Sequence, residues 1–541
     1  MTVSIRICIL ENSRTQEGHR VEDIVPDLSN IQGNIFGGFS KDHRIMLFLQ
    51  FTDAAKARVW MKGMACNISS SEEVLAFNDL FKLIRKSKGI EGVVRATWTN
   101  IAFTSSGLKA LGVPDFEINQ FPDAFRQGMA ARANRIGDVD RNAPTHWVGP
   151  FGAPERPVHA VLIVDSDIAS DLDPSIAGTT LAQYKKSIDD TVGAVKIVYS
   201  QVGATRVDQP GHEQFGFKDG VSQPGIRGVD LPDDPLNDPN QGHPGQDLLH
   251  PGEFVLGYPT QIGTPDPLAD GPNPLPGPIS MNGPRWSKDG SFAVFRRLKQ
   301  DVKGFRDNVD KLAHTLDWHK DLAGASLVGR YASGCPLERL KSQQGSFKPA
   351  QIDPGITDPG AAADDSVNNF FEYGDDADGK IVPRSAHIRK AYPRDQVGTL
   401  ASGTDTESRT QTHRLLRRGI PYGNSLGAPS GGGPDEDRGL LFLCYQKDIE
   451  AQFEFVQTRW VNDPNFPCPE AAKNKDGTST GDCPGDGQPD GEDPIMAQTT
   501  AGGFVIPGKP LRTSITHFVT TTGGDYFFAP SIEALTEVLS A

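Results

Sequence analysis

An acid surrounded by glycines is the first candidate for chemistry in this sequence. Asp219 lies in the segment FGFKDGVSQPGI (215–226), between Gly216 and Gly220. Glycine allows tight turns and close backbone approaches that a Cβ atom would forbid, so such a loop can present one carboxylate to a ligand. Asp-Gly is also a common signal for a surface turn, and an acid in such a turn is usually only solvated. The spacing alone leaves both interpretations open.

Two basic segments in the second half of the chain provide further candidates. His387 lies in SAHIRKAYPRD, and Arg417 lies in HRLLRRGIPYG. Neutral imidazole is a common metal ligand, although most histidines are surface or core residues without such a role. Helical spacing would place Arg414 and Arg417 on related faces and Arg418 nearer the opposite side. The solvated basic end of a helix would explain these arginines as well.

Four segments together resemble the dye-decolorizing peroxidases, which are haem enzymes: GFKDGVSQPGI, AHIRKAYPR, RRGIPYG and GLLFLCYQ. The resemblance runs from Asn30 to about Phe528, with breaks at Pro/Gly-rich insertions, and it fits the large, fungal-like members. It implies one haem b per chain, with His387 as the axial iron ligand. It also implies that Asp219 lies over the distal face of the iron as acid and base, and that Arg417 stabilises charge there.

The same resemblance implies other residues around the haem. Asp493, in GEDPIMAQ, is similar to the carboxylate that accepts a hydrogen bond from the axial histidine and raises its basicity. The adjacent Glu492 is the alternative. Leu440 and Phe442 match apolar residues beside the distal pocket.

Three basic residues follow the histidine: Arg389, Lys390 and Arg394. Haem propionates are anions, so each of these side chains could bind one. We choose Arg389 among them.

The implied reaction is the reduction of hydrogen peroxide coupled to oxidation of bulky dyes and phenolic compounds. Asp219 would take a proton from one peroxide oxygen and return it to the other, while Arg417 would stabilise charge on the leaving oxygen. Bulky dyes cannot enter a closed pocket, so electrons would leave through protein aromatics. Trp460 and Tyr392 are the candidates for a surface oxidation site, and ordinary packing is the alternative for both.

Oxidation of Mn(II) is a further expectation from the resemblance. Some fungal relatives oxidise manganese near a tyrosine with carboxylates around it. Asp238, Asp395, Asp405 and Glu407 could supply oxygen ligands, which suit a hard divalent cation.

Two other functions remain open. A haem-binding or haem-handling protein of the same fold could have incidental peroxidase activity, because a fold does not fix a function. The joint presence of Asp219 and Arg417 favours catalysis, since binding alone needs neither. In a binding protein without haem, Asp219 would mark only a turn.

The order of elements predicts an α+β fold of two ferredoxin-like halves, with antiparallel sheets and surrounding helices. In the first half, strand-like runs at 43–51, 96–104, 158–167 and 194–204 accompany a helical segment at 180–190. The motif around Asp219 follows the last of these strands directly.

The second half repeats this order: a strand in GSFAVFRRLKQ, a helix in DVKGFRDNVDKLAHTL, a strand in GLLFLCYQ and a helix in KDIEAQFEFVQTRW. A strand pair in SITHFVTTTGGDYFFA and a helix in PSIEALTEVLS close the chain. We therefore divide the chain into a first half at 1–228, a Pro/Gly-rich insertion at 229–284 and a second half at 285–541, which holds most of the haem pocket.

Length and composition limit the remaining choices. The 541 residues exceed the ~250 to 300 at which a single core usually stops growing, so two domains, or one duplicated domain with long insertions, are expected. The net charge of −15 argues against a nucleic-acid partner. No apolar run approaches the ~18 residues of a membrane span, which argues against a membrane role.

The cysteines and the N-terminus bear on the compartment. The six cysteines include no CxxC pair, so a zinc or redox motif is not indicated. Cys468 and Cys483 flank a polar loop and could form a disulfide in an oxidising compartment. The first 20 residues lack the apolar stretch of a signal peptide. The resemblance favours an extracellular enzyme, an intracellular one remains open, and the sequence does not indicate the oligomeric state or physiological substrate.

Overall fold

The fold is taken from a computed structural model of the chain. It describes residues 24–88, 94–234, 238–264, 272–339, 351–358, 362–376, 379–396, 407–429, 431–466, 491–498, 504–505, 512–513 and 517–541.

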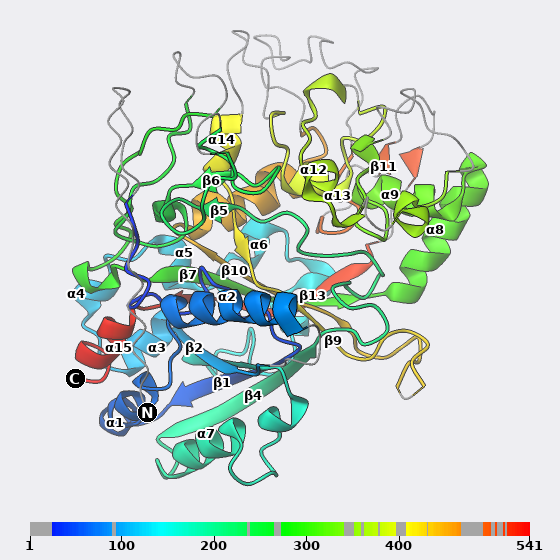
Figure 1. Ribbon diagram of the computed structural model, residues 1–541. Helices are drawn as coiled ribbons and strands as arrows, with labels where there is room; N and C mark the ends of the chain where they lie inside the picture. Colours follow the sequence, from blue (N-terminus) through cyan, green and yellow to red (C-terminus); the bar gives the residue numbers. More distant parts are fainter. Residues whose placement is uncertain are drawn as a thin grey trace, which may run out of the picture.

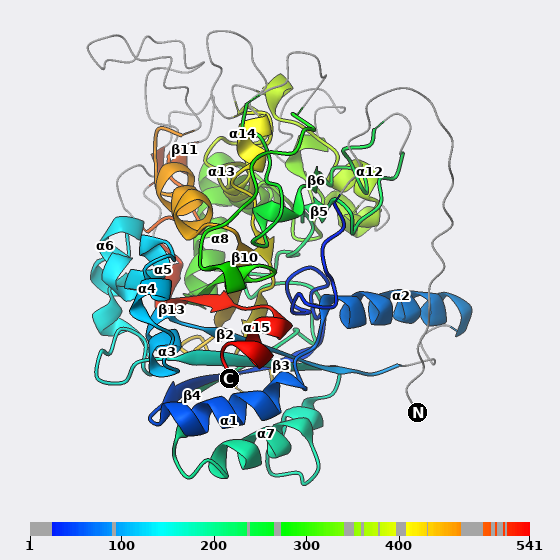
Figure 2. The same ribbon diagram turned by 90° about the vertical axis from the view of Figure 1, so that its left-hand side faces the viewer.

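Four antiparallel strands form the sheet of the first half, in the spatial order β4-β1-β3-β2. They are β1 (His43–Phe51), β2 (Thr97–Phe103), β3 (Ala160–Ser166) and β4 (Val195–Ala204). This fourth-first-third-second order is that of a ferredoxin-like unit. The helices α1 (Ala54–Ala65) and α7 (Thr180–Asp189) lie on one face of the sheet (Figures 1 and 2).

The second half repeats the arrangement in the order β13-β7-β10-β8, with β9 also pairing with β10. Its strands are β7 (Ser291–Gln300), β8 (Leu416–Arg417), β9 (Ile420–Tyr422), β10 (Gly439–Gln446) and β13 (Val519–Ala529). Phe103 of β2 pairs with Phe528 of β13, which joins the halves into a nine-stranded sheet within the described residues. The predicted pair of ferredoxin-like halves is confirmed.

The helices of the second half lie on the other side of the sheet from α1 and α7 (Figures 1 and 2). They include α8 (Val302–Leu316), α9 (Lys320–Val328), α13 (His387–Ala391), α14 (Glu407–Gln411) and two consecutive π-helical segments, Ile449–Glu454 and Val456–Val461. The predicted helix after β10 is therefore present, in π-helical form.

Shorter elements and the outer helices complete the fold. The remaining helices include α2 (Ser71–Lys88), α3 (Ser105–Ala110), α4 (Asp115–Ile118), α5 (Asp123–Gln127), α6 (Ala133–Ile136), α10 (Pro354–Thr357), α12 (Asp365–Asn368) and α15 (Ile532–Glu537). The short strands are β5 (Gly225–Ile226), β6 (Leu248–Leu249), β11 (Phe504–Val505) and β12 (Arg512–Thr513).

Helical spacing for the arginine segment at 413–418 is wrong. Leu416 and Arg417 are extended in β8, which pairs with β10, and β9 follows at Ile420–Tyr422 and pairs with the same strand. Successive side chains of an extended segment point to opposite sides. Arg417 therefore lines the active-site cavity described below, while Arg418 points into the first half and donates hydrogen bonds to the carbonyls of Asn34 and Ile35.

The expected strand pair near the C-terminus is instead one strand, β13. The Gly523-Gly524 dipeptide does not turn the chain. Its lack of side chains instead lets other residues pack closely against the strand. A Cβ atom on Gly523 would lie 2.7 Å from the ring of Phe151, and one on Gly524 would lie 2.6 Å from the sulfur of Met129. A β-bulge between Thr521 and Gly523 takes up the irregularity.

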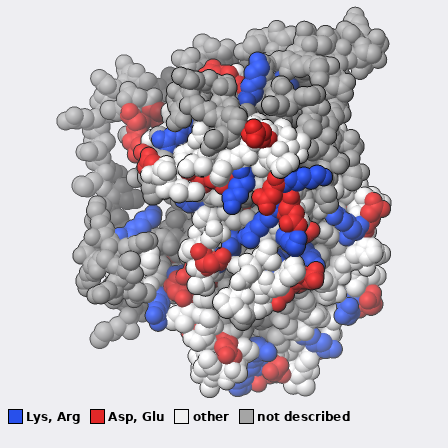
Figure 3. Space-filling model, turned by 90° about the vertical axis from the view of Figure 1, so that its right-hand side faces the viewer, with Lys and Arg blue, Asp and Glu red and all other residues white. Residues whose placement is uncertain are grey.

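The insertion at 229–284 is mostly irregular, as predicted, but it also contributes to the core. Phe254, Val255 and Leu256 are fully buried and belong to the main hydrophobic cluster. Within the described residues, no helix has the length and hydrophobicity needed to cross a membrane. On the face shown in Figure 3, basic and acidic side chains are interspersed.

Candidate active site

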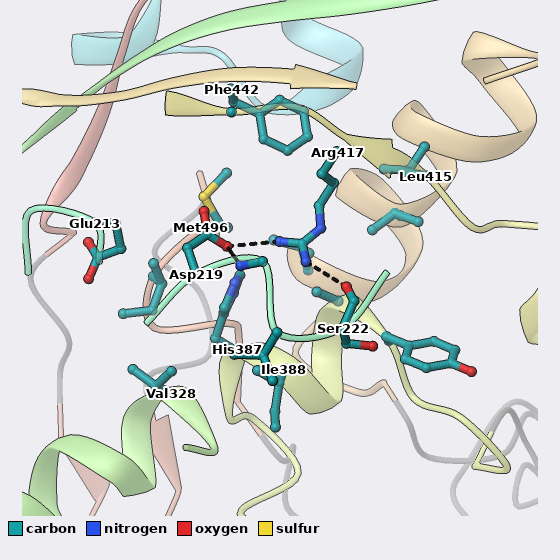
Figure 4. Close-up of a pocket in the computed structure, with 18 of the residues that line it drawn as sticks. Glu213, Asp219, Ser222, Val328, His387, Ile388, Leu415, Arg417, Phe442 and Met496 are labelled. Atoms are coloured by element: carbon teal, nitrogen blue, oxygen red, sulfur yellow. Dashed lines mark hydrogen bonds and ion pairs between the residues drawn. The ribbon is translucent and has the colours of Figure 1, made fainter. Parts of the chain in front are cut away.

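A cavity lies between the loop at 213–224 and elements of the second half (Figure 4). Strands β7 and β10, helix α13 and the π-helical segments contribute to its wall. The volume open to the centres of water molecules is about 280 Å³. A single water needs roughly 10 to 15 Å³ on this measure, so the cavity has room for a large ligand.

Asp219 is presented to the cavity by a loop that is fixed at several points. Its backbone N–H donates to the carbonyl of Gly211, and that of Lys218 donates to the carbonyl of Ala332. The next residue, Gly220, has φ of +73°, a conformation that residues with a Cβ atom rarely adopt. Its N–H donates to Asp219 Oδ1 at 2.6 Å, and the Asp219 side chain keeps 39% of its surface exposed.

Arg417 reaches the same part of the cavity from β8. Its Nη1 lies 3.2 Å from Asp219 Oδ1, and its Nη2 donates to the carbonyl of Ser222 at 2.9 Å (Figure 4). The side chain of Gln223 also binds the backbone of Arg417. An exposed carboxylate and a fixed guanidinium thus lie together, an arrangement that can move a proton and stabilise negative charge.

His387 begins α13 and also lines the cavity. Its Nδ1 lies 2.8 Å from Oδ2 of Asp493, whose side chain is fully buried. The other Asp493 oxygen accepts hydrogen bonds from the N–H groups of Ile495 and Met496. Burial, the largest single influence, opposes protonation of the imidazole, but the charge of Asp493 and the hydrogen bond to it together outweigh burial and raise the pKa of His387. With Nδ1 held in this way, Nε2 is the nitrogen available to a metal.

Apolar side chains make up much of the wall. Leu440 and Phe442 are two residues apart on β10, so both point to the same face, and both line the cavity. Val328, Ile388 and Met496 line it as well.

Arg389, our choice for a propionate, does not line the cavity and is fully buried behind it. Its Nη1 donates to Asp376 at 3.1 Å and its Nε donates to Gln396 at 2.8 Å. An internal acid therefore already neutralises this guanidinium.

Three arginines besides Arg417 line the cavity: Arg330, Arg394 and Arg414. Arg414 forms a salt bridge with Asp247. Arg330 and Arg394 form no salt bridge with a carboxylate in the described part of the chain; both donate to backbone carbonyls and approach the amide oxygen of Asn369. Burial, followed by the charge of Arg394, lowers the pKa of Arg330 to about 10. Arg394 belongs to the segment AHIRKAYPR, which resembles the family, whereas nothing in the sequence around Arg330 indicated a role in haem binding.

The two aromatic candidates occupy different places. Trp460 is only 2% exposed, so the expectation of a surface site at its indole ring is wrong. It contacts the rings of His413 and Phe466 within the protein. Tyr392 lines the cavity, and its hydroxyl donates to Asp247 at 2.5 Å.

The proposed manganese ligands that the structure describes do not form a cluster of three or more. Asp405 lies outside the described residues. Cys468 and Cys483, the expected disulfide pair, also lie outside them. Both carboxylate oxygens of Asp395 accept backbone N–H groups, from Tyr373 and Gly374. Within the described residues, no group of three or more His, Cys, Asp or Glu side chains could hold a metal ion.

Glu213 is a cavity residue that the sequence analysis missed. Its half-buried carboxylate accepts hydrogen bonds from the N–H groups of Phe215 and Phe217 and from the side chain of Gln300. Burial raises its pKa despite these bonds. The contacts connect the start of the Asp219 loop to β7, and nothing in the local sequence indicated them.

Comparison with known proteins places these features in a family. The DyP dimeric α+β barrel domain matches residues 30–206, and the C-terminal domain of Dyp-type peroxidases matches residues 372–466. The dye-decolorizing peroxidase of Exidia glandulosa is 31% identical over 95% of this chain and 87% of its own. Dye-decolorizing peroxidase msp1 of Mycetinis scorodonius is 30% identical over 95% of this chain and 88% of its own.

A solved structure agrees with this relationship. A dye-decolorizing peroxidase in complex with 2,6-dimethoxyphenol has a TM-score of 0.69 and 28% identity, over 96% of this chain and 100% of the other. Sequence, fold and cavity therefore agree, and the chain belongs to the dye-decolorizing peroxidase family of haem peroxidases.

Proposed function

We propose that the cavity binds one haem b, with His387 as the axial ligand to its iron. The donor set fits this group: one imidazole with Nδ1 held by a carboxylate, two arginines that form no salt bridge within the described residues, and apolar walls. Arg394 and Arg330 would bind the propionates, in place of Arg389. When bound, haem supplies the iron at which peroxide is reduced and the oxidising power used on the second substrate.

The contact between Asp219 and Arg417 is the single observation that carries the proposed catalysis. Asp219 takes a proton from one oxygen of hydrogen peroxide and delivers it to the other, which leaves as water. Arg417 lies beside the same carboxylate and stabilises the charge that develops on the departing oxygen. Asp493 keeps His387 oriented and electron-rich.

The second substrates are phenolic compounds and bulky dyes. One relative was solved with 2,6-dimethoxyphenol, which supports phenols as a substrate class. Tyr392, on the cavity wall, is the favoured route for electrons, and buried Trp460 would act as an internal relay. Mn(II) oxidation stays a prediction without a carboxylate cluster to support it, and formation of Mn(III)-malonate with peroxide would test it.

Haem handling without catalysis is the alternative. The variant Arg417→Leu separates the two, because haem binding does not need this side chain whereas the peroxide reaction does. We expect unchanged hemin affinity and a loss of about a hundred-fold in kcat/KM for hydrogen peroxide. Equal peroxide kinetics in the variant and the wild type would favour the haem-handling alternative.

A further inference from the structure

Tyr392 and Asp247 are a contact that the reaction described above does not use. Tyr392 follows α13 on the cavity wall, and its hydroxyl donates to Oδ2 of Asp247 at 2.5 Å. Asp247 is 145 residues earlier, in the Pro/Gly-rich insertion, and is largely buried. The phenol therefore has a carboxylate in direct hydrogen-bond contact, in a site that solvent reaches poorly.

Arg414 holds both partners. Its Nη1 forms a salt bridge with the same Asp247 oxygen, and its guanidinium lies 3.7 Å from the centre of the Tyr392 ring. Arg394 lies 5.1 Å from the ring on the same cavity wall. Two guanidinium groups and a phenol therefore surround the carboxylate that would accept the proton.

Tyr373 provides an internal contrast. It lines the same cavity and is fully buried, but its hydroxyl has no hydrogen-bond partner within the described residues. Both phenols are near the space where the haem would lie. Only Tyr392, of these two, has a base in contact with its hydroxyl.

This difference matters for oxidation. Loss of an electron from a phenol makes its hydroxyl strongly acidic, and two neighbouring guanidinium groups would oppose a cationic ring. Burial, which outweighs the opposing charge of Arg414, raises the pKa of Tyr392 well above its usual range, so the hydroxyl keeps its proton beforehand. The electron can leave readily only if the proton leaves with it, and Asp247 is in position to take it.

We propose that Tyr392 and Asp247 form a redox-active pair that passes electrons from substrates to the haem; this rests on the proposed function. One electron leaves the Tyr392 ring for the haem already oxidised by peroxide. The Oη–H bond breaks and a proton passes to Oδ2 of Asp247, which leaves a neutral tyrosyl radical. An external phenol then supplies an electron and loses its own proton to solvent, while the proton on Asp247 returns to Oη.

The test is freeze-quench electron paramagnetic resonance of the hemin-reconstituted protein after one equivalent of hydrogen peroxide, without a second substrate. Wild type should give a tyrosyl radical signal. Tyr392→Phe removes only the hydroxyl and should lose that signal, whereas Tyr373→Phe, the matched control, should keep it. An unchanged signal in Tyr392→Phe, or no tyrosyl signal in wild type that has reacted with peroxide, would overturn the proposal.

The haem absorption spectrum, recorded on the same samples, reports the peroxide reaction separately. If it does not respond to peroxide in wild type, the proposed function fails and the redox pair falls with it. If it responds but the radical is absent, only the redox pair fails.

The role of Asp247 needs its own readout. Asp247→Asn keeps the size of the side chain but cannot accept the proton, so the radical should form more slowly at an unchanged rate of peroxide consumption. Because this variant also loses the salt bridge to Arg414, the wild type is measured in D2O as well, where radical formation should slow. A rate unaffected by either change would contradict transfer to Asp247.

Discussion

The side chain of Gln223 binds both backbone polar groups of Arg417. Its Nε2 donates to the Arg417 carbonyl at 3.0 Å, and its Oε1 accepts from the Arg417 N–H at 3.3 Å. This contact connects the Asp219 loop to β8, across 194 residues of sequence. The separation between Asp219 and Arg417 is therefore set by a residue that touches neither reacting group.

Replacing Gln223 should displace Arg417 without altering the haem side of the cavity. Two hydrogen bonds contribute on the order of 1 kcal/mol each, so Gln223→Leu should slow the reaction with peroxide by about ten-fold or more. Gln223→Glu should slow it further, because its carboxylate would face the carbonyl of Arg417. Stopped-flow mixing with peroxide measures the rate, and hemin affinity should stay constant. Rates equal to wild type in both variants would rule out this positioning role.

Asp493→Asn should weaken the axial ligand. The amide cannot supply the charge that makes His387 a strong donor, and loss of such an outer partner typically costs about 10- to 100-fold in affinity. Titration with hemin, followed by absorption, measures the change. The neighbouring Glu492→Gln provides the matched control and should have a much smaller effect, and the reverse ranking would assign the role to Glu492.

Arg394 and Arg389 can be separated by a chemical probe. Hemin should bind wild type more tightly than hemin dimethyl ester, whose propionates carry no charge. Arg394→Met should remove roughly ten- to hundred-fold of the affinity for hemin while changing that for the ester little. Arg389→Met should instead lower the melting temperature and retain the preference for free hemin. If only Arg389→Met lost the preference for hemin over its dimethyl ester, Arg389 would be the propionate ligand after all.

His413 should make the protein less stable in acid. Burial, partly offset by its hydrogen bond to the carbonyl of Ala451, lowers the pKa of His413 to about 4. Between pH ~6.5 and ~4 the unfolded chain binds a proton that the folded protein does not, so stability falls as the pH falls through this window. The loss should reach roughly 2 to 3 kcal/mol.

The variant His413→Phe checks this effect, because it keeps a ring against Phe455 but cannot titrate. Urea unfolding at pH 7 and pH 4 should show a smaller decrease in the free energy of unfolding for the variant. Equal decreases in both proteins would show that His413 does not cause the acid sensitivity.

Alternation and periodicity were enough to predict most of the framework strands. The run at 43–51 is a strand over the same residues, the run at 194–204 contains the strand Val195–Ala204, and the same spatial order recurs in the second half. The segment around Arg417 was misjudged because its two strands are very short. Both strands form their hydrogen bonds with β10, which is distant in the sequence, so the local spacing of residues does not reveal that they are strands.

In the candidate site, too, some residues could be predicted from the sequence and others could not. The segments containing Asp219, His387 and Arg417 could be selected from the sequence, and the fold brings all three side chains to one cavity. Asp247 could not be selected, because its partner lies 145 residues away and its own surroundings are an ordinary Pro/Gly-rich loop. The sequence also could not predict which of these side chains would be buried. Arg389 is buried away from the cavity, and Trp460 is buried away from the surface.

The central claim is that Asp219 carries the proton during peroxide reduction. The most direct measurement compares hemin-reconstituted wild type and Asp219→Asn, mixed with one equivalent of hydrogen peroxide and followed through the haem absorption band. The account predicts an intact band in both proteins before mixing and a reaction about 10²- to 10⁴-fold slower in the variant. A variant that binds hemin normally and reacts as fast as wild type would contradict it.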